Sequence, residues 1–212
     1  MKKLFFSLSL LLIGFVGFSQ SAEYTSGMKG LLMKMEASKS PEALHAAANG
    51  FERIAAAEPK QWLPKYYAAY CYVMEAMSST DKEKIDGIVD QADAQLEAAL
   101  AIEKNDEIVC LQSLCKTARI NVNPMTRGMK FGPQAARLLE TAGAMNAGNP
   151  RVFFLKGQSA FYTPEAFGGG KDKAKEMFTK AVELFKNFKP LNDLMPIWGA
   201  DDATKMLAEC SK

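Results

Sequence analysis

A run of glycines followed by lysine, Gly168-Gly169-Gly170-Lys171, is the segment that most resembles a phosphate-binding loop. A glycine-rich loop that enters a helix can cradle an anion on its backbone N–H groups. The nucleotide-binding pattern fails here, because Glu165 stands where its first glycine belongs and Asp172 replaces the Ser or Thr that would hold magnesium. We therefore predict a tight turn with glycine at positive φ and an acidic residue near the helix start.

The sequence also lacks the residues that other catalytic and metal-binding motifs require. His45 is the single histidine, and the sequence around it supplies no catalytic or metal-binding partner. There is no Gly-x-Ser-x-Gly elbow and no His-Glu-x-x-His motif. Four acidic residues resemble a calcium loop only loosely, because Gly87 is misplaced and the helical period continues through them. They are Asp81, Glu83, Asp86 and Asp90. We predict a protein that is not an enzyme, with no catalytic residues, no cofactor and no metal site.

The four cysteines are Cys71, Cys110, Cys115 and Cys210. Cys110 and Cys115 lie roughly 140° apart around a predicted helix, so they should not bridge each other. A bridge from Cys71 to either of them is an alternative in an oxidising compartment. We favour buried free thiols that pack as small hydrophobic groups.

Aromatic residues concentrate on two predicted helices and suggest a binding surface. Trp62, Tyr66 and Tyr70 recur every four residues, and a second group surrounds Phe154. Most of these side chains must belong to the core, but some can form a groove for a peptide or an apolar ligand. The candidate partner-binding residues, with their nearest polar neighbours, are Tyr66, Tyr70, Arg119, Arg151, Phe154 and Gln158.

The elements that must position these residues follow a pattern that returns four times, at intervals of roughly 40 residues. Each copy has a small residue, a large apolar residue four positions later and an apolar residue three positions further on. This spacing places all three on one helical face. The copies begin at Ala47, Ala92, Ala135 and Ala174. The pattern predicts stacked helical hairpins, an architecture that usually binds partners and rarely catalyses reactions.

We predict an all-α fold of nine helices, because Ala and Met are abundant and no stretch alternates with a period of two. The expected hairpins span about 25–57, 62–103, 106–146 and 150–187, with a capping helix at about 201–210. In the third hairpin we expect a loop at 121–132, followed by a helix with Pro133 in its first turn. Trp198, in an apolar link before the last helix, is expected to dock onto the stack.

The N-terminus has the three parts of a secretory signal peptide. Met1-Lys2-Lys3 is positively charged, Leu4 to Val16 is largely apolar, and small residues precede a cleavage site after Ser19. Cleavage after Ser21 is the alternative. We predict a signal peptide at 1–19, a helical-repeat domain at 20–212, and a periplasmic or secreted protein with no membrane span after cleavage.

The charge balance argues against a nucleic-acid partner. The precursor has 26 basic and 24 acidic residues, and removal of Lys2 and Lys3 with the leader makes the two numbers equal. Nucleic-acid binding normally needs a positive surface that releases counterions. We predict no nucleic-acid partner.

The repeated pattern resembles the tetratricopeptide repeat (TPR). That family has a small residue, a bulky residue four later, a small residue three later and a Pro- or Asn-rich closing turn. The closing turns here are Glu58-Pro59, Asn105-Asp106 and Asn149-Pro150. The resemblance covers most of 28–187 and implies a right-handed α-solenoid of four TPR-like hairpins. The units are longer than the family's period of about 34 residues, so the repeats are degenerate.

The segment from Tyr162 to Lys171 is similar to a Pro-x-x-Phe-Gly-Gly loop in some TPR-like families, including secreted bacterial repeat proteins. This resemblance implies a helical-repeat binding protein and names no ligand. We predict a non-catalytic protein–protein interaction scaffold or adaptor of the cell envelope, which binds a protein or peptide through the concave face. The alternative is a periplasmic ligand-binding or transport-accessory protein with a small apolar ligand, suggested by the aromatic first helices.

Overall fold

The computed structural model describes residues 21–212, and the predicted signal peptide at 1–19 lies outside the described residues. The described chain is all-helical and contains no strand, which confirms the predicted fold class at the level of all-α. Its α-helices are α1 (Ala22–Ala37), α2 (Pro41–Ala57), α3 (Leu63–Ser78), α4 (Lys82–Leu100), α5 (Asp106–Ile120), α6 (Pro124–Met145), α7 (Pro150–Tyr162), α8 (Lys171–Asn187) and α9 (Ala200–Glu209). A short 3-10 helix, η1 (Glu165–Phe167), lies between α7 and α8.

Side-chain caps explain where several helices begin. Ser21 accepts a hydrogen bond of 3.0 Å from the backbone N–H of Tyr24, and Asn105 accepts one of 3.0 Å from Ile108. Each cap satisfies one of the backbone donors that the first turn of a helix leaves without a partner. Proline occupies the first position of α2, α6 and α7, where its missing N–H costs nothing.

The expected loop at 121–132 is wrong, because most of that segment is helical. α6 begins at Pro124, nine residues before the predicted start, and Pro133 lies inside the helix. Asn123 caps the helix by accepting from the N–H of Thr126 at 3.3 Å, and Pro124 follows as the first helical residue. This cap and proline are a start signal that precedes Pro133, and Pro133 is tolerated two turns further on.

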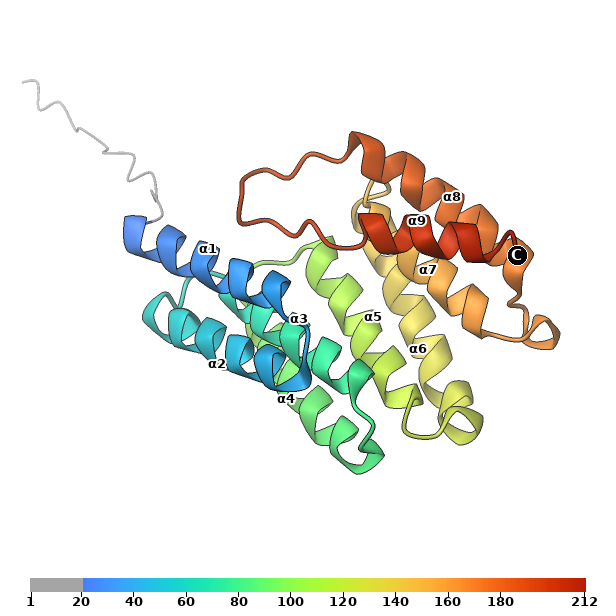
Figure 1. Ribbon diagram of the computed structural model, residues 1–212, viewed down its shortest axis with the longest axis horizontal. Helices are drawn as coiled ribbons and strands as arrows, with labels where there is room; N and C mark the ends of the chain where they lie inside the picture. Colours follow the sequence, from blue (N-terminus) through green and yellow to red (C-terminus); the bar gives the residue numbers. More distant parts are fainter. Residues whose placement is uncertain (1–20) are drawn as a thin grey trace, which may run out of the picture.

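Consecutive helices pack against each other in the order of the chain, and α5 also contacts α3 and α7, the first helices of the neighbouring hairpins (Figure 1). The hairpins are α1/α2, α3/α4, α5/α6 and α7/α8, and α9 packs against α8. Because the two helices of each hairpin are antiparallel, the connections within the hairpins gather at one end of the stack (Figure 1). The connections between successive hairpins lie at the opposite end.

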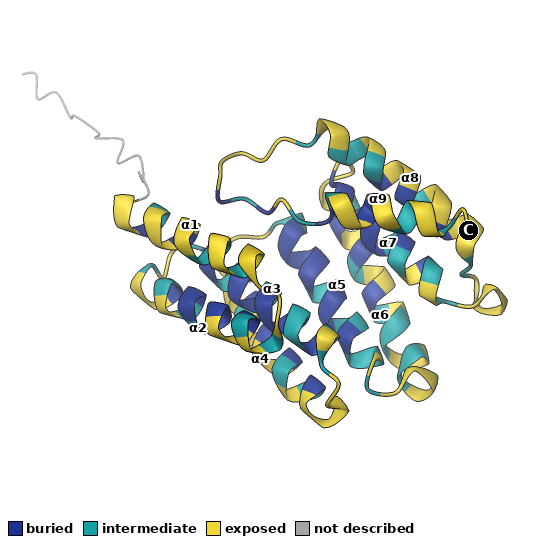
Figure 2. Cartoon of the chain, in the orientation of Figure 1, coloured by how far each residue is buried: buried dark blue, intermediate teal, exposed yellow. Residues whose placement is uncertain are grey.

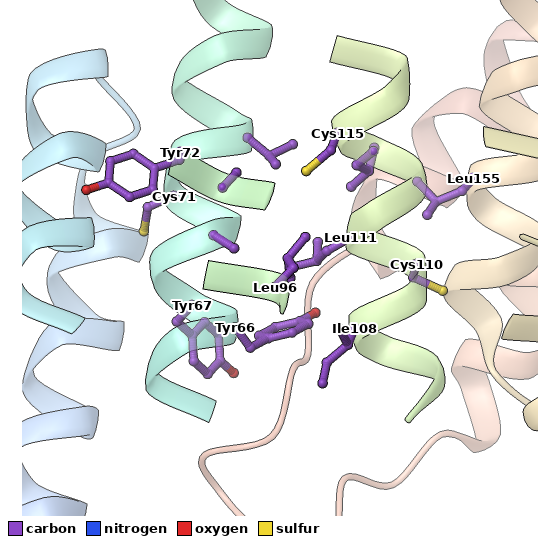
Figure 3. Packing of buried hydrophobic residues seen from close by; sticks show 14 of the residues in the cluster. Tyr66, Tyr67, Cys71, Tyr72, Leu96, Ile108, Cys110, Leu111, Cys115 and Leu155 are labelled. Atoms are coloured by element: carbon purple, nitrogen blue, oxygen red, sulfur yellow. The ribbon is translucent and has the colours of Figure 1, made fainter. Parts of the chain in front are cut away.

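The repeated pattern lies on the second helix of each hairpin and points into the core. Ala92, Leu96 and Ala99 are fully buried on α4, and the corresponding residues of α8 are also buried. Figure 2 shows this buried side on the second helices, which also have an exposed side, whereas α5 has no exposed residue and α3 has only Ser78. Figure 3 shows Leu96 beside Leu111 and Tyr66, so the core joins α4 to α5 and α3. The interior is continuous from one hairpin to the next.

All four cysteines are free thiols, and Cys71, Cys110 and Cys115 are buried in the core (Figure 3). Burial, with a smaller effect from Glu75, raises the pKa of Cys71 to about 12. Burial also raises the pKa of Cys110 and Cys115 well above the usual value. These thiols therefore pack as small hydrophobic groups and are poor nucleophiles.

No helix within 21–212 combines the length and apolar character that a membrane span requires.

Candidate functional site

Residues 188–199, which we call the strap, connect α8 to α9 and cross from the last hairpin toward the first two (Figure 1). Asp193 of the strap forms a 2.8 Å ion pair with Lys29 of α1. The hydroxyl of Tyr67 on α3 donates a 2.8 Å hydrogen bond to the carbonyl oxygen of Leu194. Since these partners are more than 120 residues away in sequence, the strap ties the last hairpin to the first two.

Arg151 of α7 is the fully buried charge that holds the strap. Its Nη1 donates to Glu107 Oε1 at 3.0 Å, and its Nη2 donates to the carbonyl oxygen of Pro196. The guanidinium carbon lies 4.7 Å from the ring centre of Phe188 and 5.2 Å from that of Trp198. Aromatic faces attract a cation most strongly where water is excluded. Through these contacts the buried guanidinium joins α5 and α7 to the strap.

Glu107 of α5 completes this buried polar group. Besides Arg151, it accepts hydrogen bonds from Asn149 Nδ2 at 2.8 Å and from the hydroxyl of Tyr66 at 3.4 Å. Burial raises the pKa of the Glu107 carboxyl, and the neighbouring Arg151 charge opposes that rise. The group joins α3, α5 and α7, which are the first helices of three hairpins.

Trp198 docks onto the stack, as predicted. Its Nε1 donates a 2.8 Å hydrogen bond to the hydroxyl of Tyr66. Its ring centre lies 5.6 Å from that of Tyr70 and 6.4 Å from that of Phe154. The strap therefore covers aromatic residues of the first-helix face.

Four of the six predicted partner-binding residues meet around Trp198. Tyr66, Arg151 and Phe154 are buried there, and Tyr70 is half-buried. The other two are placed differently: Gln158 is half-buried further along α7, and Arg119 pairs with α4. Arg119 Nη2 lies 2.6 Å from Asp90 and 2.8 Å from Asp93. A role of these six residues in partner binding stays a prediction.

The glycine-rich segment is a turn, as predicted. Gly168 and Gly170 have φ values of 81° and 110°, which favour glycine. Its N–H groups are used inside the protein, because Gly168 donates to Glu165 at 2.8 Å and Gly170 donates to Ala160 at 2.9 Å. Gly169 donates to Pro164 at 3.2 Å. These donors are therefore not available to a phosphate group.

Four large apolar side chains are exposed at the end of the stack where the within-hairpin connections gather. Met125 and Met129 lie one turn apart on α6, and Tyr162 and Phe167 flank the start of the connection between α7 and α8. Their exposed fractions are 88%, 85%, 74% and 79%, in that order. We call these four residues the Met–aromatic end, because the start of α6 and the connection from α7 to α8 lie at this end of the stack (Figure 1). Large exposed apolar groups at one end of the stack make this end a candidate binding surface.

Lysines flank the Met–aromatic end. Lys130 follows Met129, and its Nζ lies 5.0 Å from the ring centre of Phe131. Lys171 is the first residue of α8, and Lys173 donates a 2.9 Å hydrogen bond to the carbonyl oxygen of Gly168. The surface therefore combines methionine and aromatic side chains with nearby positive charges.

Sequence reasoning missed the two methionines of the Met–aromatic end, because it treated the start of α6 as a loop. In a helix, Met125 and Met129 are four residues apart and share one face. The Asn123-Pro124 start signal was the feature that could have revealed this face.

His45 has a carboxylate neighbour but no metal-binding group around it. Its Nδ1 lies 3.1 Å from Glu75 Oε2, and its ring meets Tyr72 edge-on at 5.8 Å between centres. Within the part of the chain that the structure describes, no group of three or more His, Cys, Asp or Glu side chains is arranged to hold a metal ion.

Comparison with solved structures identifies a relative over almost the whole chain. The HusA haemophore from Porphyromonas gingivalis superimposes with a TM-score of 0.83 and 33% sequence identity. The match covers 91% of this chain and 94% of that one. No protein-family model matches the chain, and no curated protein matches it. Because one third of the residues are identical over nearly the full length of both proteins, the chain belongs to the same family as the HusA haemophore.

Proposed function

We propose that the protein is a non-catalytic carrier of haem in the cell envelope, and that the Met–aromatic end holds the ligand. The observation that carries this proposal is the family relationship to a haemophore, together with four exposed Met, Tyr and Phe side chains at one end of the stack. The sequence-based alternative of a ligand-binding protein is thereby preferred to the scaffold.

The residues at this end match the chemistry of haem. The macrocycle is flat and apolar, and the rings of Tyr162 and Phe167 supply flat apolar contacts. Methionine sulfur and tyrosine oxygen are both known ligands of haem iron. The lysines near the end can pair with the two propionate groups of haem, since exposed ammonium groups attract carboxylates.

A spectroscopic titration tests the proposal. We expect haemin to shift the Soret band of the purified protein with saturation at one equivalent, and metal-free protoporphyrin to bind more weakly if a side chain ligates the iron. Replacing both methionines, as in Met125→Ala with Met129→Ala, should weaken haemin binding about tenfold, the effect of losing roughly 1.4 kcal/mol. Tyr162→Phe removes an oxygen that can ligate the iron and keeps the ring, whereas Phe167→Ala removes an apolar contact. Comparing the two variants separates these contributions.

The matched control uses apolar residues of similar exposure on the strap. Leu191→Ala with Ile197→Ala removes side chains that are 90% and 61% exposed, far from α6 in sequence. This control should bind haemin like the unmodified protein. If the control loses binding and the methionine variant keeps it, the ligand lies at the strap and the assignment to the Met–aromatic end is wrong.

The alternative is a scaffold in which TPR-like hairpins form a right-handed solenoid and a protein or peptide binds its concave face. The repeated core pattern and the contacts of α5 with α3 and α7 support such a stack. The strap covers Tyr66 and Arg151, which leaves Gln158 and part of Tyr70 for a partner. Crosslinking in intact cells, followed by purification, tests this function, and a partner that protects α3 and α7 from labelling would support it.

Export through the predicted signal peptide at 1–19 is part of the proposal. Cell fractionation should find the protein outside the cytoplasm, with a mature N-terminus at Gln20 or Ala22. Retention of the full precursor in the cytoplasm would contradict it.

A further inference from the structure

The interface between α1 and α2 leaves a depression of about 390 Å³ at the end of the stack opposite the Met–aromatic end. The depression is open to solvent rather than enclosed. The lining comes from the first turns of α1 and the last turns of α2. It consists of Ser21, Glu23, Tyr24, Gly27, Leu31, Gly50, Arg53, Ile54, Ala57 and Glu58.

The floor of the depression is apolar and depends on two glycines. A Cβ atom at Gly50 would lie 2.6 Å from Leu31 Cδ2, and one at Gly27 would lie 3.3 Å from Ile54 Cδ1. The two helices therefore approach closely where Leu31 covers Gly50. Ile54 and Ala57 continue the apolar surface from there toward the start of α1.

Tyr24 is the feature that distinguishes this depression from an ordinary groove between helices. Its side chain is only 3% exposed, and its hydroxyl has no hydrogen-bond partner in the described chain. A buried hydroxyl without a partner is uncommon and destabilising. Burial, and to a smaller extent Glu58, raises the pKa of Tyr24 to about 12, so the hydroxyl keeps its proton at neutral pH and can donate it.

The rim of the depression carries charges of both signs. Arg53, Glu23 and Glu58 line it, and none of the three forms an ion pair with another residue of 21–212. A ligand with one carboxylate and no cation would leave both glutamates unpaired. A ligand with one cation and no carboxylate would leave the guanidinium unpaired. Charges of both signs around an apolar floor favour a ligand that has both signs itself.

We propose that this depression binds a small zwitterionic peptide with apolar side chains. Its carboxylate pairs with Arg53, its ammonium group pairs with Glu58 or Glu23, and a carbonyl oxygen accepts the hydrogen bond of Tyr24. The apolar side chains lie on Ile54 and Leu31. This site is separate from the proposed haem surface, and either one can exist without the other.

Calorimetric titration with dileucine and its two blocked forms tests the proposal. We expect the N-acetyl form and the C-terminal amide each to bind at least about fivefold more weakly than dileucine, since each loses one charge pair. Arg53→Gln should remove the preference for dileucine over its amide. Glu23→Gln with Glu58→Gln should remove the preference for dileucine over its N-acetyl form.

Tyr24→Phe tests the hydrogen bond without disturbing the fold. It should weaken dileucine binding about fivefold, as expected for one net hydrogen bond, and leave the melting temperature unchanged or higher because an unpartnered hydroxyl is removed. Arg137→Gln, an exposed substitution on α6, is the matched control and should bind like the unmodified protein.

Two results would overturn the proposal. One is the absence of saturable binding of dileucine at millimolar concentration by the unmodified protein. The other is binding in which the arginine and glutamate variants keep the full preference for the unblocked ends. A haemin titration of Arg53→Gln should match that of the unmodified protein, so failure of this site and failure of the haem surface give different results.

Discussion

Trp198 Nε1 donates a 2.8 Å hydrogen bond to the hydroxyl of Tyr66, which is 132 residues earlier in the chain. This contact joins the strap to α3 and places the indole ring beside Tyr70 and Phe154. The last segment of the chain thus completes the core of an earlier hairpin.

The hydrogen bond between Trp198 and Tyr66 should couple their contributions to stability. Trp198→Phe and Tyr66→Phe should each lower the free energy of unfolding by about 1–2 kcal/mol, because each leaves a polar group without its partner. The double variant should lose about 1 kcal/mol less than the sum. Urea unfolding of the four proteins measures this coupling, and strictly additive losses would show that the bond contributes nothing.

Arg151→Met should be one of the most destabilising single substitutions. It leaves the carboxylate of Glu107 buried without its cation, which typically costs about 3–5 kcal/mol. Arg151→Lys should also destabilise, because a single ammonium group does not reproduce the fork that reaches both Glu107 and Pro196. Denaturant midpoints measure the effect.

Replacing both charges supplies the control for that experiment. Arg151→Met with Glu107→Leu should be more stable than Arg151→Met alone, since no unpaired charge remains. If Arg151→Met alone unfolds at the same denaturant concentration as the unmodified protein, the buried pair does not hold the strap.

Asp86 should contribute a pH-dependent part of the stability. Arg127 donates to its two carboxylate oxygens at 2.7 and 2.8 Å, and these hydrogen bonds lower the pKa of Asp86 in the folded protein. The stabilisation is complete above the unfolded-state pKa, which is about 3.9, and is lost as the pH falls through the lower folded-state value. Because the side chain is 41% exposed, the contribution should stay below about 1 kcal/mol.

Asp86→Asn measures this contribution. The variant should be less stable than the unmodified protein at pH 7, and the difference should shrink steadily below about pH 4. Urea unfolding between pH 2.5 and 7 checks the trend. A difference that grows on acidification would contradict the assigned pKa direction.

Gly157→Ala should separate α7 from α8. An added Cβ would lie 2.6 Å from Cδ1 and Cε1 of the Phe178 ring, so the helices must move apart at a cost of about 1–3 kcal/mol. Gly87→Ala is the matched control, because no atom outside its own helix backbone lies within 4 Å of the added Cβ. The control should raise stability by about 0.5–1 kcal/mol through helix propensity. Equal changes in melting temperature for the two variants would refute the close approach of Gly157 to the Phe178 ring.

Local signals in the sequence were sufficient for much of the fold. The spacing of Ala92, Leu96 and Ala99 places them on one face of α4, and that face is buried. Gly168 and Gly170 adopt the positive φ values expected of a turn. The predicted start of α6 was wrong because Pro124 and Pro133 can each occupy the first turn of a helix. Only the cap at Asn123 distinguishes the two prolines.

The candidate sites depended on packing that local signals do not encode. Tyr66, Arg151 and Phe154 were expected on a binding surface, and the structure buries them beneath the strap. Met125 and Met129 were not predicted as site residues. They share an exposed helical face only because α6 begins before them, at Pro124.

The sequence by itself determined that the chain forms helical hairpins with alanine-lined inner faces, because periodicity and caps act over a few residues and survive any arrangement of the helices. Only the tertiary structure decided which polar and aromatic residues are buried. Contacts such as Trp198 with Tyr66 or Arg151 with Pro196 require the strap to cross the stack. The path of the strap depends on packing between segments that are distant in sequence, and short sequence patterns do not contain that information.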